Sequence, residues 1–560
     1  MSFLKINNLS VNYEMRKETI YAVKKINIDV KKGEILGLVG ESGSGKSTLG
    51  NAIINLIDEP GKISKGTVIL DGVNIHEKPE DILKYRGKKI GLIFQDPQTS
   101  LNPLLTIGEQ LVETIQTHLK LNLDESKKRA IDLLKEVGIK DAKNRFDDYP
   151  HQFSGGMRQR VVISLALCCE PELLIADEPT TALDVSIQSQ ILELIKTLTK
   201  ERNLAVILIT HDMGVISETV DRVAVMKNGD LVEIGTTKEL LTNPKEIYTK
   251  SLISSVPPTN KKISRFKIIE KENKIEGEAN IKILNRWNKK KIISQDLIKV
   301  KNLKKTFQDG IFTETSKNTV MAVNDVSFNI KEGESFGLVG ESGSGKSTIA
   351  KMVVNLFKPT SGEIFFDNIC ITKIKKNKEM MNFRKQIQMI FQDPYSSLNG
   401  RLKVKDIIAE PIKLHNPLIA NKDLDNYIND LLESVELSRQ SATRYPHEFS
   451  GGQRQRISIA RALATQPRLL VCDEPTSALD VSIQAQILNL LKDLQEQLNL
   501  TILFISHDLP VVRQMCDRIA VLKNGKLCEI SMTEELFKNP NHEYTKELLT
   551  LMPKIESIYN

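Results

Sequence analysis

Short apolar runs alternate with longer amphipathic segments along most of the chain. In the first half, the runs EILGLVG, LLIAD and LAVILIT are almost wholly apolar, which is typical of strands buried on both faces of a mainly parallel sheet. The opening of each half alternates more, as in LKINNLSVNY, and this predicts a small, mostly antiparallel sheet. Residues near 104–148 and 401–444 have a helical pattern. The predicted fold class is α/β, with a mainly parallel core sheet flanked by helices, an N-terminal antiparallel β subdomain and a helical subdomain.

This arrangement is expected twice, because the two halves of the chain repeat each other. The string GLVGESGSGKST stands at 37–48 and again at 337–348. Downstream motifs recur in both halves in the same order and at the same spacing. A repeat of this length indicates the tandem duplication of a whole domain and not a short-period solenoid. We therefore predict one domain over residues 1–255 and a second over residues 297–560.

The segment between the halves, residues 256–296, is far longer than an ordinary loop. It opens with two prolines and contains the only tryptophan, Trp287. Its many lysines include Lys261, Lys262, Lys267, Lys271, Lys274, Lys289, Lys290 and Lys291. This composition predicts a basic flexible linker, a solvated tether between the domains. The alternative is a basic docking segment anchored by Trp287.

Length, charge and cysteine content narrow the class of protein. A chain of 560 residues suits two to four domains. The net charge of +7 is small compared with the 78 basic and 71 acidic side chains, so it is only weak evidence for nucleic-acid binding. It fits a lysine-rich solvated surface or proximity to anionic lipid. The longest apolar stretch, VVISLALCC, is too short to span a bilayer, and the N-terminus lacks a secretory core. Cys168 and Cys169 are expected to be buried apolar residues in a reducing compartment.

Each repeated string contains G-x-x-x-x-G-K-[ST], the phosphate-binding loop of nucleoside triphosphatases. Its glycines let the backbone approach phosphate without a Cβ, and its N–H groups with the following helix start form an anion site. The lysine would contact the β- and γ-phosphates, and the next serine would reach Mg²⁺. A chance glycine-rich turn does not explain two identical copies. The candidate ATP-binding residues of the loops are Gly40, Ser42, Gly43, Gly45, Lys46, Ser47, Thr48, Gly340, Ser342, Gly343, Gly345, Lys346, Ser347 and Thr348.

Two acids end a buried strand in each half. LLIADE ends in Asp177 and Glu178, and LLVCDE ends in Asp473 and Glu474. Ligands gather at the carboxyl ends of such strands, so the aspartates are placed to hold Mg²⁺ and the glutamates to take a proton from the attacking water. The alternative is a helix N-cap acid followed by an acid that favours the helix dipole. A position downstream of a phosphate loop favours the catalytic interpretation.

Further polar residues follow strand-like runs in both halves. His211 and His507 are candidate catalytic residues that contact the γ-phosphate or orient water, although a lone histidine is usually a satisfied polar group. Gln95 and Gln392 offer a neutral amide to Mg²⁺ and the water. The candidate metal-binding residues are Ser47, Gln95, Asp177, Ser347, Gln392 and Asp473.

A second glycine-rich motif, FSGGMRQR or FSGGQRQR, precedes a long helical run in each half. It predicts a second phosphate-binding helix start, and a simple serine N-cap is the alternative. Its candidate ATP-binding residues are Ser154, Gly155, Gly156, Ser450, Gly451, Gly452 and Gln453. Tyr13 and Phe307 occupy matching positions before the first strands and are candidates either to stack on adenine or to join the core.

The phosphate loop, the glutamine of FQDP, SGG, Asp-Glu, an ALD turn and the histidine occur in this order in each half. This order resembles the nucleotide-binding subunit of an ABC transporter, with two such domains fused. FQDPxxSLNP, YPHxFSGGxRQR and the terminal NPxxxYTxxL are similar to those of importers of oligopeptides, dipeptides, nickel chelates and glutathione. The resemblance implies an ATPase that binds ATP and Mg²⁺ and powers the import of peptides, glutathione or a related small solute.

The resemblance also implies partners and a mechanism. It implies two membrane-spanning permease subunits, an extracytoplasmic solute-binding protein, and a peripheral location on the cytoplasmic face of the bacterial inner membrane, with no nucleic acid and no covalent cofactor. The halves would close head-to-tail on two ATP molecules, the loop at 40–48 facing the signature at 450–454 and the loop at 340–348 facing that at 154–158. Contacts that exist only in the closed state would let ATP drive closure. The segments after Gln95 and Gln392 would receive the coupling helices.

Two departures from the family pattern and two alternatives are relevant here. The fifth signature residue is usually glutamine, as in Gln453, but the first half has Met157, whose thioether cannot donate a hydrogen bond. Residues 251–297 contain no cysteine, so no iron–sulfur centre is expected. Glutamate and histidine stand in both halves, so both sites are expected to hydrolyse ATP.

Two alternative functions remain. One is a soluble two-domain ATPase acting in translation, whose D-E-P-T-N-H-L-D string is absent here. The other is the ATPase subunit of an exporter.

Overall fold

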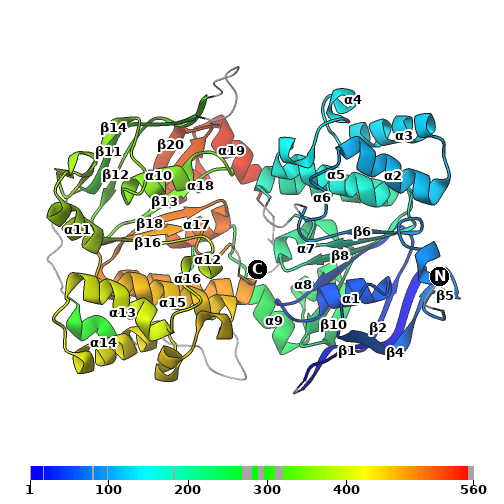
Figure 1. The fold of residues 1–560 in the computed structure, drawn as a ribbon, viewed down its shortest axis with the longest axis horizontal. Helices are drawn as coiled ribbons and strands as arrows, with labels where there is room; N and C mark the ends of the chain where they lie inside the picture. The colour runs from blue at the N-terminus through cyan, green and yellow to red at the C-terminus, as the bar shows by residue number, and fades with distance from the viewer. Residues whose placement is uncertain are drawn as a thin grey trace. The chain divides into compact units, whose positions relative to one another are not determined.

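The structure, a computed structural model, describes residues 2–16, 18–78, 81–97, 99–180, 183–267, 281–287, 296–308, 319–477 and 479–552. The chain forms two compact units, unit 1 over Met1–Val256 and unit 2 over Pro257–Met552 (Figure 1). Each unit is described by itself.

Unit 1 opens with a four-stranded antiparallel sheet of order β2-β1-β4-β5. Its strands are β1 (Leu4–Glu14), β2 (Thr19–Val30), β4 (Gly61–Leu70) and β5 (Val73–Asn74). The alternation of apolar and polar residues in β1 places Leu4, Ile6, Leu9 and Val11 in the core, as expected for a sheet with one covered face. The predicted antiparallel β subdomain is confirmed.

The core sheet of unit 1 has six strands in the order β10-β9-β3-β8-β7-β6. They are β3 (Ile35–Val39), β6 (Ile90–Ile93), β7 (Leu173–Asp177), β8 (Ala205–Thr210), β9 (Arg222–Lys227) and β10 (Asp230–Thr236). All neighbouring pairs are parallel except β9 with β10. Every residue of β3 and β8 is buried, because helices cover both faces of a parallel sheet. The mainly parallel core sheet is confirmed.

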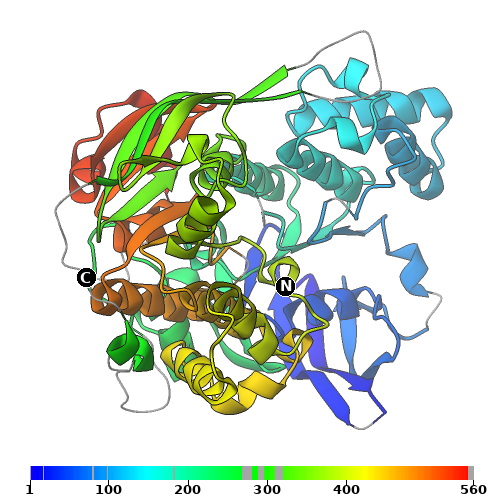
Figure 2. The ribbon, with the colours of Figure 1, turned by 60° about the vertical axis from the view of Figure 1, so that its left-hand side comes forward.

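A helical subdomain interrupts the core between β6 and β7. The helices of unit 1 are α1 (Lys46–Ile53), α2 (Ile107–Leu119), α3 (Leu123–Glu136), α4 (Ala142–Arg145), α5 (Gly155–Leu167), α6 (Val185–Glu201), α7 (Met213–Thr219), α8 (Thr237–Thr242) and α9 (Ile247–Ser254), with 3₁₀ turns η1 (Asp81–Lys84) and η2 (Pro150–Gln152). Thr106 and Asn122 begin α2 and α3 with capping boxes. Within unit 1, α2 to α4 lie at the end opposite to β1, β2 and β4, with the core sheet between them (Figures 1 and 2).

Unit 2 repeats this architecture. Its antiparallel sheet has the order β12-β11-β14-β15, and its core sheet has the order β16-β17-β18-β13-β19-β20. The strands are β11 (Asp296–Gln308), β12 (Thr319–Lys331), β13 (Ser335–Val339), β14 (Ser361–Phe366), β15 (Ile369–Cys370), β16 (Ile387–Ile390), β17 (Leu469–Asp473), β18 (Thr501–Ser506), β19 (Arg518–Lys523) and β20 (Lys526–Met532).

The helices of unit 2 follow the same plan as those of unit 1. They are α10 (Lys346–Val353), α11 (Asn377–Gln386), α12 (Pro394–Ser397), α13 (Val404–His415), α14 (Asn421–Ser434), α15 (Gly451–Leu463), α16 (Val481–Leu498), α17 (Leu509–Met515), α18 (Thr533–Lys538) and α19 (Glu543–Thr550), with η3 (Lys282–Arg286), η4 (Ile371–Lys373), η5 (Arg439–Thr443) and η6 (Pro446–Glu448). The helical subdomain predicted near 401–444 corresponds to α13, α14 and η5.

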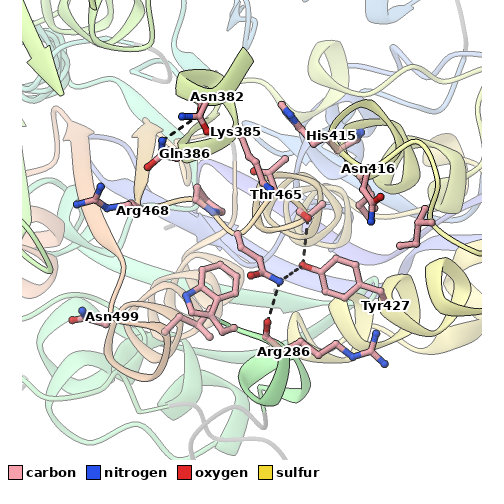
Figure 3. A pocket seen from close by; sticks show the side chains of 18 of the residues that line it. Arg286, Asn382, Lys385, Gln386, His415, Asn416, Tyr427, Thr465, Arg468 and Asn499 are labelled. Carbon is pink, nitrogen blue, oxygen red and sulfur yellow. Dashed lines mark hydrogen bonds between the residues drawn. The ribbon is translucent and has the colours of Figure 1, made fainter. Parts of the chain in front are cut away.

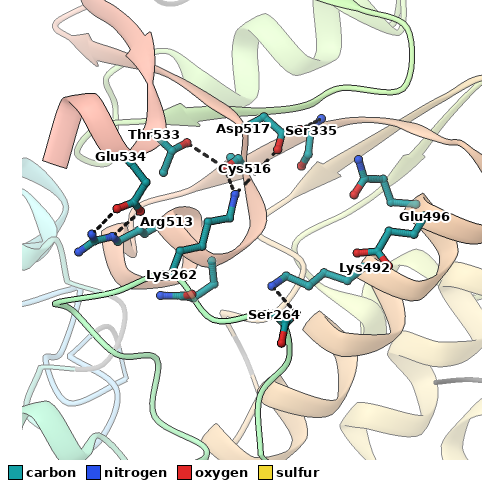
Figure 4. A network of polar contacts seen from close by, with 12 residues as sticks. Lys262, Ser264, Ser335, Lys492, Glu496, Arg513, Cys516, Asp517, Thr533 and Glu534 are labelled. Carbon is teal, nitrogen blue, oxygen red and sulfur yellow. Dashed lines mark hydrogen bonds and ion pairs between the residues drawn. The ribbon is translucent and has the colours of Figure 1, made fainter. Parts of the chain in front are cut away.

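Residues 257–267, which we call the strap, lie against α16 and α17 of unit 2 (Figure 4). Gln514, fully buried in α17, donates to the carbonyl oxygens of Pro258 and Lys261, both at 3.0 Å, and accepts from the N–H of Ile263 at 2.7 Å. The buried Lys492 of α16 donates to the carbonyl oxygens of Ile263 and Ser264 at 3.0 and 2.9 Å. The strap is therefore held mainly through its backbone.

Side chains of the strap add apolar and charged contacts with unit 2. Phe266 is 3% exposed and belongs to the largest core cluster of unit 2. Arg265 pairs with Asp493 and Glu496, each at 2.7 Å. Lys262 donates to the carbonyl oxygen of Cys516 at 2.8 Å (Figure 4). The strap thus has the contacts of an integral part of unit 2.

A second stretch of the segment, which includes η3, packs on the helical subdomain of unit 2. The N–H of Ile283 donates to Ser434 at 3.2 Å, and Ile283 and Trp287 are 0% and 9% exposed in the core cluster. The prediction of a solvated flexible tether is therefore wrong for the described parts of 256–296, because they bury large apolar side chains. The anchoring role considered for Trp287 agrees with its burial. The lysines Lys271, Lys274, Lys289, Lys290 and Lys291 lie outside the described residues.

Within the ranges that the structure describes, no helix is both long enough and apolar enough to cross a membrane. The longest apolar run instead forms the second half of α5 and its end. Cys168 and Cys169 follow that helix, are 1% and 4% exposed, and have their sulfur atoms 3.7 Å apart. The prediction that both are buried is confirmed.

Candidate nucleotide-binding sites

The phosphate loop of unit 1 follows the fully buried strand β3 and leads directly into α1. Gly40 and Gly45 are in close contact with neighbouring backbone, since a Cβ on either would lie 2.2 Å from the carbonyl oxygen of Met226 or Ala22. Gly43 has a φ of 76° with nothing near its added Cβ, so the loop is open at this point. The loop of unit 2 has the same geometry at Gly340, Gly343 and Gly345. Only glycine fits these positions.

The loop lysines are buried and point back into their own loops. Lys46 is 5% exposed, and its Nζ donates to the carbonyl oxygens of Gly40 and Glu41 at 2.7 and 2.8 Å. Lys346 makes the equivalent bonds to Gly340 and Glu341 at the same distances. Each ammonium group therefore lies inside a ring of loop atoms, where it can neutralise an anion held by the loop N–H groups.

The serine after each lysine contacts the aspartate that ends strand β7 in unit 1 and strand β17 in unit 2. Ser47 donates to Asp177 at 3.1 Å, and Ser347 donates to Asp473 at 2.9 Å. Burial raises the pKa of both aspartates above the usual value, and the neighbouring glutamate charge adds to this, although the serine hydrogen bonds oppose it. A carboxylate and a hydroxyl oxygen in a desolvated position are the ligand types that Mg²⁺ prefers, so these residues fit a magnesium ion.

The glutamate that follows each aspartate is held from two sides. Glu178 accepts from the side-chain amide of Gln95 at 3.0 Å, and its other oxygen lies 3.0 Å from Nδ1 of His211. In unit 2, Glu474 accepts from Gln392 at 2.8 Å and lies 3.2 Å from His507. Since each glutamine donates its N–H to the glutamate, its amide oxygen is the atom that fits a metal.

The backbone of the two glutamates is strained. Glu178 and Glu474 have φ angles of 46° and 47°, in the left-handed region that non-glycine residues rarely adopt. Their N–H groups still donate to Ile209 and Ile505 on the next strand, at 2.9 and 3.0 Å. Strain of this kind persists only where surrounding contacts fix the residue, and it clusters at functional sites. Nothing in the pattern of residues predicted this conformation.

The electrostatics of the second glutamate–histidine pair follow from these contacts. Burial alone would raise the pKa of Glu474, but the hydrogen bond and charge of His507 outweigh it and leave that pKa lowered. Burial alone would lower the pKa of His507, but the hydrogen bond and charge of Glu474 leave it raised. The pair therefore favours an ionised carboxylate, which can accept a proton.

The signature motifs begin long helices, as predicted. Ser154 and Ser450 are the N-cap residues of α5 and α15, and each accepts from the N–H three residues on at 3.4 Å. In unit 2 the amide oxygen of Gln453 also accepts from the N–H of Ser450 at 3.2 Å and closes a capping box. The start of α5 has no capping box, because the thioether of Met157 is only a weak acceptor. The two halves therefore differ in a hydrogen-bond acceptor as well as in the donor that the sequence suggested.

The two candidate adenine-stacking residues lie inside the first strands and not before them, which corrects the predicted placement. Tyr13 pairs with Ile20 between β1 and β2, and Phe307 pairs with Val320 between β11 and β12. These are matching positions, because both are near the end of the first strand. Tyr13 packs partly on the core, while Phe307 is 37% exposed and packs edge-on against Phe357. Their role in stacking stays a prediction.

A cavity of about 960 Å³ in unit 2 lies near the amino-terminal ends of the parallel strands of the core sheet (Figure 3). Four residues of its lining stand within three residues of the starts of parallel strands of that sheet: Glu332, Gln386, Arg468 and Asn499. The phosphate loop, the glutamine, the acids and the histidine all follow the same strands. Since parallel strands run in one direction, the cavity and the nucleotide site lie on opposite edges of the sheet.

The structure thus brings Lys46, Ser47, Gln95, Asp177, Glu178 and His211 together at the carboxyl edge of the core sheet of unit 1. It does the same for Lys346, Ser347, Gln392, Asp473, Glu474 and His507 in unit 2. The signature serines and glycines begin separate helices of each unit. The sequence interpretation overlooked Tyr248 and Tyr544, whose hydroxyl groups accept from loop N–H groups. Their repetition within NPxxxYTxxL was the signal that could have identified them.

Comparison with protein families gives two matches. The family model described as "ABC transporter" matches residues 23–181 and 323–477. The model described as "Oligopeptide/dipeptide transporter, C-terminal region" matches residues 232–281 and 528–559.

Curated relatives match the chain along almost its whole length. The chain is 42% identical over 571 residues to the glutathione import ATP-binding protein GsiA of Escherichia coli (strain K12) and to that of Shigella dysenteriae serotype 1 (strain Sd197). Each alignment covers 99% of this chain and 90% of the relative. Among solved structures, the dimeric post-hydrolysis state of the ATP-binding cassette MJ0796 bound to ADP and Pi is 33% identical, with a TM-score of 0.39, over 42% of this chain and 98% of that chain.

Proposed function

This chain belongs to the ABC transporter family, and on that premise we propose that it is the ATP-hydrolysing subunit of an importer of peptides or glutathione. The relatives named as glutathione import proteins support glutathione, and the oligopeptide/dipeptide C-terminal region supports di- and oligopeptides. A nickel chelate is a related solute of the same group. No observation favours the alternative in translation.

The single observation that supports hydrolysis best is the glutamate held between a glutamine and a histidine in both units. In our proposal Glu178 and Glu474 each accept a proton from the attacking water. The oxygen of that water bonds to the γ-phosphorus, the bond to the β-phosphate oxygen breaks, and ADP and phosphate leave. His211 and His507 hold the carboxylates in position, and Lys46 and Lys346 neutralise the phosphate charge.

Magnesium ion is proposed as the metal partner of ATP at each site. Ser47, Gln95 and Asp177 would hold it in unit 1, and the equivalent residues of unit 2 are Ser347, Gln392 and Asp473. When bound, the ion supplies positive charge to the phosphate oxygens. The serine–aspartate hydrogen bonds support this assignment, because they place a hydroxyl oxygen beside a carboxylate in each unit.

We further propose that the signature motifs complete the sites in a head-to-tail arrangement of the two halves. Ser154, Gly155 and Gly156 would contact the nucleotide bound by Lys346. Ser450, Gly451, Gly452 and Gln453 would contact the nucleotide bound by Lys46. Ser154 and Ser450 are the N-cap residues of α5 and α15, and helix starts of this kind bind phosphate, which supports the proposal.

The proposed partners are two membrane-spanning permease subunits and, indirectly, an extracytoplasmic solute-binding protein. The proposed location is the cytoplasmic face of the inner membrane, as a peripheral subunit. Family membership supports both proposals, because importers of this family divide ATP hydrolysis and membrane passage between subunits.

Two measurements test the function. Cells with and without the gene are compared for uptake of labelled glutathione and of a labelled dipeptide, with the Glu178→Gln/Glu474→Gln double variant as the matched control. We expect uptake of at least one solute to require the wild-type chain. Fractionation supplies the second measurement: co-purification with membranes supports the importer, whereas co-sedimentation with ribosomes and unchanged uptake would contradict it.

A further inference from the structure

We propose that Tyr248 and Tyr544 are positioning residues that fix the start of the two phosphate loops for ATP binding. The inference rests on the proposed function, because it assigns these residues to the same nucleotide sites.

Each tyrosine hydroxyl contacts the backbone of a phosphate loop. The Tyr248 hydroxyl, on α9, accepts from the N–H of Glu41 at 3.2 Å. The Tyr544 hydroxyl, on α19, accepts from the N–H of Glu341 at 3.3 Å. The carbonyl oxygen of Glu41 accepts in turn from Lys46 at 2.8 Å. Both backbone polar groups of this loop residue are therefore fixed, one by the tyrosine and one by the lysine.

The helix that carries each tyrosine is attached to the core sheet by a glutamate. Glu233 of β10 accepts from the N–H groups of Lys245 and Glu246, at 2.9 and 3.2 Å, just before α9 begins. Glu529 of β20 accepts from the N–H groups at residues 541 and 542, both at 3.0 Å, just before α19. A continuous set of contacts thus runs from the edge strand through the helix start and the tyrosine to the phosphate loop.

The ammonium group of a lysine at the end of a core strand lies over each tyrosine ring. Nζ of Lys227 lies 4.4 Å from the centroid of the Tyr248 ring, and Nζ of Lys523 lies 4.1 Å from that of Tyr544. These cation–π contacts add to the packing of the ring face, whereas the position of the hydroxyl oxygen is set by the anchored helix that carries the tyrosine. The lysines therefore allow ring packing and hydroxyl acceptance to be tested separately.

The hydroxyl is kept in its neutral form, at least in unit 2. Burial and the charge of Glu341 raise the pKa of Tyr544 well above its ordinary value, and a hydrogen bond to the Glu341 carboxylate adds to this. A neutral phenol can donate to that carboxylate and accept from the loop N–H at once. One side chain thereby fixes two parts of the same loop residue.

Nothing in the phosphate-loop motif requires a tyrosine some 200 residues downstream. The contact nevertheless occurs in both units with the same atoms. Its physical consequence is preorganisation, because a loop held in its binding conformation loses less conformational entropy when phosphate binds.

The test uses the full-length chain with Tyr248→Phe and Tyr544→Phe, each of which removes one oxygen atom and keeps the ring. Lys227→Met and Lys523→Met are the matched controls, which disturb the ring contact and keep the hydroxyl. Steady-state ATP hydrolysis gives KM and kcat per folded molecule, and thermal unfolding gives Tm. Calorimetric titration with ATP and Mg²⁺, in the Glu178→Gln/Glu474→Gln background, gives Kd without turnover.

We expect each phenylalanine variant to raise KM and Kd for ATP about fivefold or more, the equivalent of roughly 1 kcal/mol per lost hydrogen bond, with kcat changed less than about twofold. The lysine variants should leave KM and Kd near wild type. An unchanged Kd in the phenylalanine variants, or an equal rise in the lysine variants, would overturn the inference. If the wild type binds ATP but does not hydrolyse it, the proposed function fails while the Kd comparison still decides the role of the tyrosines.

Discussion

Nδ1 of His507 lies 3.2 Å from Oε1 of Glu474, the first residue after strand β17. His507 itself follows the neighbouring strand β18. The pairing therefore arises because two adjacent parallel strands end at the same edge of the sheet. The same pairing in unit 1, at 3.0 Å between His211 and Glu178, supports two equivalent hydrolytic sites.

Replacing one catalytic glutamate with glutamine should remove the turnover of its own site, and replacing both should abolish most ATP turnover. Glu178→Gln and Glu474→Gln keep the size of the side chain but remove the proton acceptor, so each alone should lower kcat about twofold or more and the double variant should lower it by about 100-fold or more. ATP binding should persist, because the phosphate loops are unchanged. Phosphate release by the full-length chain measures turnover. If one variant matches the wild type, the two sites are not equally competent.

The signature residue should set the stability of the helix start in each unit. Met157→Gln supplies the acceptor that closes the capping box in unit 2, and Gln453→Met removes it. We expect the first to stabilise the start of α5 and the second to destabilise that of α15, each by about 0.5–1 kcal/mol. Hydrogen–deuterium exchange of the Ser154 and Ser450 amides checks this. Unchanged exchange at Ser450 in Gln453→Met would refute the role of the amide oxygen.

The strap should stabilise unit 2 through Gln514. Gln514→Leu leaves three strap backbone groups without their partner, so the free energy of unfolding of unit 2 should fall on the order of 3 kcal/mol. Trp287, the only tryptophan and a buried one, reports unfolding of this unit by fluorescence during urea titration. Glu218→Ala, at the equivalent position of α7, is the control. It should leave the urea midpoint of the Trp287 fluorescence transition unchanged. Equal transitions in wild type and Gln514→Leu would show that the strap adds no stability.

Docking of the strap should strengthen as the pH rises. Burial, with the charges of Arg265 and Lys262, lowers the pKa of Lys492 to about 8 from its ordinary 10.5. Below pH 8 the lysine is protonated in both states and its burial costs stability. Between pH 8 and 10.5 the folded state releases the proton while the unfolded state keeps it, so stability rises with pH.

Complete deprotonation of the buried Lys492 should raise the free energy of unfolding by about 3 kcal/mol. Only part of this gain is reached by pH 9.5. The measurement is the urea midpoint of unit 2, followed through Trp287 from pH 7 to 9.5, for the wild type and Lys492→Met. The urea midpoint of the wild type, relative to that of Lys492→Met, should increase as the pH rises. A constant difference would contradict the lowered pKa.

The sequence by itself determined the buried strands of each core sheet and the polar residues at their carboxyl ends. Apolar runs such as those of β3 and β8 predict buried parallel strands, and polar residues that directly follow such strands must meet at one edge. Glu178 and His211 come together for this reason, although 33 residues separate them. Local pattern suffices here, because strand direction alone fixes where each strand ends.

Only the tertiary structure decided the contacts between distant segments that have no shared periodicity. Tyr248 reaches the N–H of Glu41 across 207 residues, and Gln514 reaches Pro258 across 256 residues. In both cases a side chain bonds to backbone, which every residue possesses, so the partner segment carries no distinguishing sequence. The lysines of residues 256–296 predict a solvated linker, whereas burial of Phe266 and Trp287 depends on the apolar surface that the folded unit 2 presents to them.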